Sequence, residues 1–124
     1  MIDEIKLKEL HLRDPIPIRL GNLASSVKRL GYLVHSKKSE KTVYQLFREC
    51  KLFSGWTLPD VEFKVKLQLE ALQSELENWQ QGFHSDNGNE LWRAEINAAC
   101  EQWSNRILEL SGLLKTGRSS VVQV

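Results

Sequence analysis

The sequence lacks the residue patterns on which most catalytic and metal sites depend. Its 124 residues include only two cysteines and three histidines. The cysteines, Cys50 and Cys100, form no CxxC pair, and no histidine belongs to a Glu-x-x-His pair of the kind that holds metals in helical bundles. A GxSxG sequence and a glycine-rich phosphate loop are also absent. We therefore expect a non-enzymatic protein without catalytic, metal-binding or cofactor-binding residues.

Long hydrophobic runs are absent as well. No segment approaches the roughly 20 apolar residues that a transmembrane helix requires. The opening MIDEIKLKEL is charged throughout and contains no signal-peptide hydrophobic region. With 41% hydrophobic and 27% charged residues, the composition is that of an ordinary globular domain. We expect a cytoplasmic protein without membrane contact, in which both cysteines are buried thiols.

The strongest pattern present lies between Thr57 and Phe83 and predicts a long central helix. Thr57 and Asp60 can form a capping box, with Pro59 in the first turn, where its missing N–H is harmless. Apolar residues then recur at alternating steps of four and three, as on the buried face of a gently supercoiled helix. These residues are Val65, Leu69, Leu72, Leu76, Trp79 and Phe83.

Two more helices are predicted before the central one, on either side of a polar connection at residues 35–39. The first begins at Pro15 with Asp14 as its N-cap, and the second follows Ser39 and ends before Gly55. The buried face of the first comprises Leu20, Leu23, Ala24, Val27, Leu30, Gly31 and Val34. That of the second comprises Val43, Leu46, Phe47, Cys50 and Phe53.

A last helix is predicted after the loop at residues 84–89, with Asn89 as its N-cap. Its buried face comprises Trp92, Ile96, Ala99, Trp103, Ile107, Leu110 and Leu114. The prediction is an all-α, antiparallel four-helix bundle over residues 15–115, with an N-terminal arm (1–14) and a disordered tail (116–124). The last two predicted helices, at roughly 37–39 Å, exceed the others, so their hairpin should overhang and need cover.

Residues 1–13 carry two competing patterns. Ile5, Leu7 and Leu10 nearly alternate with polar residues, which suits an extended arm, whereas Ile2, Ile5 and Glu9 suit a short helix. We favour the extended arm. None of the three histidines, at positions 11, 35 and 84, falls on a predicted buried face.

A second apolar strip on the central helix indicates a contact surface. At about 100° per residue, Phe63 and Leu67 point away from the buried face, where charge is expected. Leu108 on the last helix is likewise off its buried face. Either the arm or a neighbouring helix covers Phe63 and Leu67, or they bind another molecule. Our leading hypothesis is an interaction or adaptor module that forms a homodimer through these residues.

Charge is distributed unevenly, and this supports an alternative hypothesis. The net charge of +1 conceals a local balance of +5 between Lys28 and Lys66 and of −6 between Glu70 and Glu101. A basic cluster could bind nucleic acid or an acidic partner; it comprises Lys28, Arg29, Lys37, Lys38 and Lys41. Against this, Glu40 interrupts the cluster and the pI is only 7.8, so a solvated bundle end is the favoured interpretation.

His35 supports a third hypothesis. His35 to Lys38 resembles the His-x-x-Lys of phosphotransfer bundles, but Ser39 stands where that family has glycine, and a solvated loop histidine is favoured. Two longer segments, LRDPIPIRLGNLASSV and CEQWSNRILELSGLL, resemble a family of small cyanobacterial helical proteins with no established activity. The resemblance implies a cytoplasmic helical domain and transfers no site residues.

Overall fold

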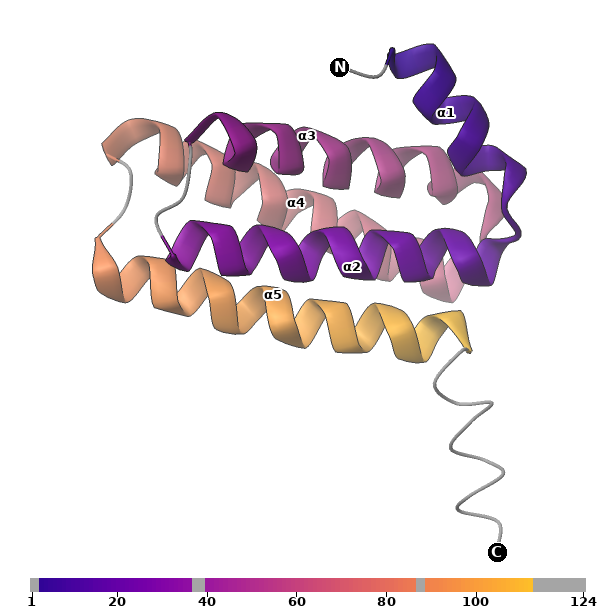
Figure 1. Cartoon of the computed structure of the whole chain (residues 1–124). Helices are drawn as coiled ribbons and strands as arrows, with labels where there is room; N and C mark the ends of the chain where they lie inside the picture. Colours follow the sequence, from indigo (N-terminus) through magenta and orange to yellow (C-terminus); the bar gives the residue numbers. More distant parts are fainter. Residues whose placement is uncertain (1–2, 37–39, 87–88, 113–124) are drawn as a thin grey trace, which may run out of the picture.

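The computed structural model describes residues 3–36, 40–86 and 89–112, and it confirms the all-α prediction. The helices are α1 (Glu4–Arg13), α2 (Ile16–His35), α3 (Glu40–Thr57), the 3-10 turn η1 (Leu58–Asp60), α4 (Phe63–Asp86) and α5 (Glu90–Ser111). The last four α-helices run antiparallel in sequence order, and α1 lies at the end of the bundle where α3 ends (Figure 1). Among the described helices, none is both long and apolar enough to cross a membrane. The predicted tail lies outside the described residues.

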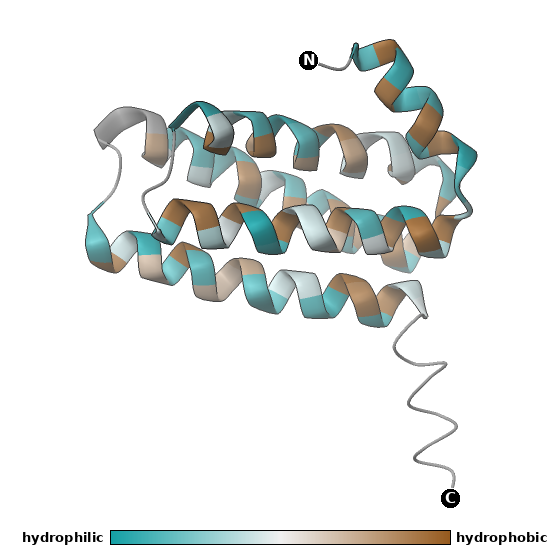
Figure 2. Cartoon of the chain, viewed as in Figure 1, coloured by the Kyte–Doolittle hydropathy of each residue, from teal (hydrophilic) through white to brown (hydrophobic). Residues whose placement is uncertain are grey.

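The predicted buried faces of α2, α3 and α4 are confirmed, and that of α5 is confirmed in part. Within the described chain, every residue of the faces predicted for α2, α3 and α4 is buried. Of the face predicted for α5, Ile96, Trp103 and Ile107 are buried, Trp92, Ala99 and Leu110 are half-buried, and Leu114 lies outside the described residues. Apolar residues accordingly line the inner faces of the helices (Figure 2). The Asn89 side chain accepts a hydrogen bond from the amide of Trp92 at 2.8 Å, as predicted for its N-cap role.

The favoured extended arm is wrong, because residues 4–13 form a helix. Leu7, Leu10 and His11, spaced as i, i+3 and i+4, share one side of α1, and this side is half-buried or buried. A ten-residue helix is too short to be stable alone, so its contacts with α3 hold it. At its first turn, Glu4 pairs with Arg48 of α3.

Three predicted helix boundaries are also wrong. The central helix begins at Phe63, because Thr57 is the last residue of α3 and donates its hydroxyl to the Phe53 carbonyl of the same helix at 2.8 Å. It therefore forms no capping box with Asp60, and α3 continues through Gly55. At the start of α2, Pro15 rather than Asp14 is the N-cap.

These boundaries reduce the predicted overhang. With 18 residues, α3 spans about 27 Å, against about 36 Å for the 24 residues of α4.

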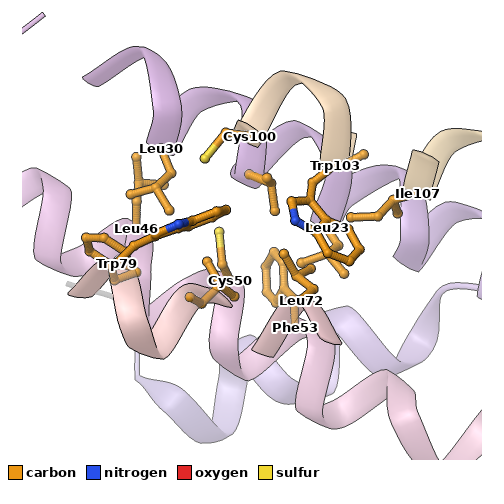
Figure 3. Close-up of a cluster of buried hydrophobic side chains, with 14 of the residues drawn as sticks. Leu23, Leu30, Leu46, Cys50, Phe53, Leu72, Trp79, Cys100, Trp103 and Ile107 are labelled. Carbon is orange, nitrogen blue, oxygen red and sulfur yellow. The ribbon is translucent and has the colours of Figure 1, made fainter. Parts of the chain in front are cut away.

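The packing also differs from a simple hairpin of the last two helices, because α5 contacts α2 far more extensively than it contacts α4. Buried apolar side chains fill the centre of the bundle. Trp79 of α4 lies near Cys50 of α3 there, and the second cysteine, Cys100, comes from α5 (Figure 3).

Candidate functional site

The predicted interface residues do not share one environment. Phe63 and Leu67 lie one turn apart at the start of α4 and are 72% and 48% exposed, so α1 does not cover them. Leu108 on α5 is half-buried and packs against the core. Arg106 of α5 reaches Gln68 of α4 at 3.4 Å, which places the two helices side by side at this level.

Small and uncharged residues continue the face that Phe63 and Leu67 begin. Ala71, Ser74 and Asn78 follow along α4 at helical spacing, and all three are exposed. Because their side chains are short, another helix can approach this part of α4 closely. We call the strip formed by Phe63, Leu67, Ala71, Ser74 and Asn78 the α4 face.

On one side of the α4 face the bordering charge changes sign along the helix, whereas Glu70 and Glu77 border the other side. Lys64 lies beside Phe63, and Glu75 lies on the same side three turns later, at about 60° and 80° from Leu67 around the helix axis. The beginning of this border is therefore basic and its middle is acidic.

The described part of the basic cluster is exposed. Lys28 and Arg29 lie on α2 and Lys41 lies on α3, with the acidic Glu40 beside it. Lys37 and Lys38 lie outside the described residues. Binding of nucleic acid or an acidic partner through this cluster therefore stays a prediction.

The structure also reveals a site that sequence reasoning missed, the corner where α1 meets α2, α3 and η1. His11 is 3% exposed, and its ring stacks on Phe53 with ring centroids 4.4 Å apart and planes 12° apart. Its Nε2 lies 2.9 Å from the hydroxyl of Thr57. The prediction that His11 avoids buried faces is therefore wrong, and the helical spacing of Leu7, Leu10 and His11 was the signal that could have found it.

The hydrogen bonds around His11 fix its tautomer. Thr57 gives its own proton to the Phe53 carbonyl, so its oxygen accepts from His11 and Nε2 must carry the ring proton. Nδ1 is then a bare acceptor, and this buried atom has no hydrogen-bond partner in the described structure. Burial lowers the pKa of His11 below its ordinary value of 6.5, and the nearby Arg19 guanidinium lowers it further.

Arg19 ties this corner together. Its guanidinium donates to the Asp14 carbonyl at 2.7 Å and the Leu12 carbonyl at 3.1 Å, at the end of α1. It also pairs with the Asp60 carboxylate of η1 at 2.7 Å. A cation at the C-terminal end of a helix satisfies carbonyls that lack partners within the helix.

A solvent-open hollow of about 280 Å³ lies beside His11. Leu7, Leu10 and Phe53 give it apolar walls. Its polar lining comprises His11, Arg13, Asp14 and Asn22, of which Arg13 and Asn22 are exposed. The lining of the hollow is therefore partly apolar and partly polar.

His35 and Arg93 each make contacts that join helices of the bundle. His35 is exposed at the end of α2, where its Nδ1 accepts from the Asn97 amide at 3.3 Å. Arg93 of α5 is buried; it donates to the Val34 carbonyl near the end of α2, and its guanidinium lies 5.2 Å from the centroid of the Phe83 ring. Arg93 therefore holds three helices together at this end of the bundle.

Both cysteines are buried free thiols, as predicted. Burial raises the pKa of Cys50 well above its ordinary value, and it raises that of Cys100 to about 12. Because the thiolate is the reactive form of cysteine, neither side chain is a nucleophile in the folded chain at neutral pH. Within the described residues, no group of three or more His, Cys, Asp or Glu side chains could hold a metal ion.

Comparisons with protein-family models, with curated proteins and with solved structures find no match to this chain. The resemblance to cyanobacterial helical proteins stays a prediction.

Proposed function

We propose that this chain is a non-enzymatic interaction module that pairs with a second copy of itself through the α4 face. The observation that carries the proposal is the exposure of Phe63 and Leu67 on adjacent turns of one helix. Single exposed apolar residues are common on protein surfaces. Two such residues that continue into a strip of small side chains are better explained as a contact surface, because an approaching helix can bury them.

Charge order favours a second copy of the chain as the partner. In an antiparallel pair, residues on the same side of the two helices face one another. Lys64 of one copy then lies opposite Glu75 of the other, and the arrangement occurs twice because the contact has twofold symmetry. A parallel pair would instead place like charges together, which disfavours that arrangement.

The sizes of the side chains agree with the register in which Lys64 faces Glu75. When Lys64 faces Glu75, Phe63 of one copy lies over the short side chains near Ser74 of the other, and Leu67 lies near Ala71. Large residues thus meet small ones along the strip, which is the complementarity that helix packing requires. Ala71 lies closest to the twofold axis on the strip itself. Glu70, on the other border, faces its own copy there, and this like-charge contact partly offsets the two Lys64–Glu75 pairs.

Sedimentation equilibrium tests this function. The wild-type chain of 14.3 kDa should sediment at twice that mass, and Phe63→Glu with Leu67→Lys should sediment as a monomer with unchanged helical circular dichroism. Leu91→Glu is the matched control, because Leu91 is 71% exposed on α5 and lies outside the α4 face. It should remain a dimer. A monomeric wild type, or a double variant that stays dimeric, would overturn the proposal.

A further inference from the structure

We propose that α1 is an acid-released helix, which packs on α3 while His11 is neutral and detaches from it when His11 takes up a second ring proton. The release exposes Phe53 and Trp56, the two rings that His11 contacts. This inference is independent of self-association, because α1 does not cover the exposed residues of the α4 face.

The packing of α1 depends chiefly on His11. Among the ten residues of α1, His11 alone is buried. Its ring stacks on Phe53 at a centroid distance of 4.4 Å and lies 5.8 Å from the ring of Trp56. Its Nε2 donates to the Thr57 hydroxyl at 2.9 Å. A change in the charge of this one ring therefore acts on the main contact between α1 and the bundle.

The remaining contacts of α1 are weaker. Leu7 and Leu10 are only half-buried, and the pair between Glu4 and Arg48 is exposed, so it contributes little. The helix projects from the end of the bundle (Figure 1). Segments with few buried contacts open locally without unfolding the rest of a protein, and a ten-residue helix is not stable alone. Once detached, α1 should also lose its helical hydrogen bonds.

Protonation of His11 and opening of α1 are linked by the position of Nδ1. This nitrogen is the atom that must accept the second proton, because Nε2 already carries one. It is buried and has no hydrogen-bond partner in the described structure, so solvent reaches it only when α1 moves. In the packed helix the added N–H would be a buried charged donor without an acceptor, which folded proteins avoid.

The charges around His11 favour release in acid. Arg19 of α2 disfavours a proton on the ring, Asp14 opposes this effect more weakly, and Asp60 of η1 is paired with Arg19. Arg13 of α1 is exposed, and the residues of α3 that contact the ring are uncharged. Burial first, and Arg19 second, lower the pKa of His11. The packed helix thus binds this proton less tightly than the released one, and acid shifts the balance to release.

The release is confined to α1. The buried apolar core of the described chain comes entirely from α2 to α5. Arg19 donates to the Leu12 carbonyl at 3.1 Å and to the Asp14 carbonyl at 2.7 Å, which holds the end of α1 to α2. The part of α1 up to His11 can therefore detach while the bundle stays folded.

Hydrogen–deuterium exchange at pH 7 and pH 5, with labelling times scaled for the slower intrinsic exchange in acid, tests the proposal. Because release takes up one proton below pH 6.5, the protection of residues 4–11 should fall about tenfold between these pH values. The protection of α4 around Leu72, which is 0% exposed, should change by less than about twofold. Unchanged protection of α1 would mean that the packed helix accommodates the imidazolium, and an equal fall in α1 and α4 would mean that the whole bundle opens. Either result would overturn the proposal.

Three variants assign the effect to His11. His11→Phe keeps a ring against Phe53 and His11→Gln keeps a donor for Thr57, and neither new side chain titrates, so the protection of α1 should no longer fall in acid. His35→Gln is the matched control, because it removes an exposed histidine at the far end of α2 from α1. It should keep the wild-type fall. A fall that persists in both His11 variants, or that disappears in His35→Gln, would contradict the proposal.

Discussion

Gly31 of α2 lies directly against Cys100 of α5, within the most extensive helix contact of the bundle. A Cβ atom at Gly31 would lie 2.6 Å from Cys100 Cβ and 3.1 Å from Asn97 Cα. Both atoms are rigid parts of a packed helix, so neither can move aside cheaply. The absence of a side chain at Gly31 is what lets α2 and α5 approach so closely.

Gly31→Ala should therefore destabilise the fold although alanine favours helices. We expect the free energy of unfolding to fall by about 1–3 kcal/mol, because the added methyl forces the helices apart. Gly55→Ala is the matched control, since its Cβ would meet only the Gln73 side chain at 3.4 Å. It should raise stability by about 0.4–1 kcal/mol. Urea unfolding of both variants measures the difference, and equal effects would contradict the helix contact.

Leu72→Ala tests the predicted core of the central helix. Leu72 is 0% exposed, so its truncation leaves a cavity and should reduce the free energy of unfolding by about 2–5 kcal/mol. Leu91→Ala removes the same atoms from a side chain that is 71% exposed and should change stability by less than about 0.5 kcal/mol. A loss below about 1 kcal/mol for Leu72→Ala would mean that this face is not the core.

Acid should destabilise the chain through His11. The unfolded chain takes up a proton near the ordinary pKa of 6.5, whereas in the folded chain burial first, and Arg19 second, lower the pKa of His11. The contribution of neutral His11 is therefore complete above pH 6.5, and it is lost as the pH falls through the lower folded pKa. His11→Gln should flatten this part of the profile of unfolding free energy against pH.

The exposed histidine provides the comparison for that profile. His35→Gln is the matched variant, because it replaces an exposed histidine at the end of α2, away from this corner. If His11→Gln and wild type lose stability equally below pH 6.5, the buried neutral state of His11 is wrong.

Both thiols should be inert until the chain unfolds. Burial raises the pKa of Cys100 to about 12 and that of Cys50 well above its ordinary value, so the thiolate fraction at neutral pH is negligible. Iodoacetamide labelling followed by mass spectrometry should show no adduct in buffer and two adducts in denaturant. Rapid labelling of Cys50 or Cys100 in the folded chain would contradict their burial.

The sequence was sufficient to predict the helical class and nearly all of the core, because burial follows the helical period wherever apolar residues are well spaced. It misplaced Thr57, whose capping-box pattern with Asp60 is real in the sequence. In the structure, long-range contact with His11 and the helical bond to Phe53 use the Thr57 hydroxyl instead. Local signals of this kind cannot reveal which distant residue will compete for the same group.

One of the two candidate sites could likewise be predicted from the sequence, and the other could not. The exposure of Phe63 and Leu67 could be predicted, because it depends only on their angle relative to the buried face of their own helix. The hollow beside His11 could not, because Leu7, Asn22 and Phe53 come from three helices that meet only in the folded chain. The burial of Arg93 against Phe83 was likewise not predicted.

The central claim, self-association through the α4 face, is tested most directly by disulfide cross-linking of Ala71→Cys. Ala71 is exposed and lies close to the proposed twofold axis, and the native cysteines are buried, so the new thiol reports on this face alone. Under mild oxidation the account predicts rapid formation of a covalent dimer by Ala71→Cys. The control Ser25→Cys, at an exposed position of α2, should form almost none. Equally slow cross-linking of the two variants would contradict the proposed interface.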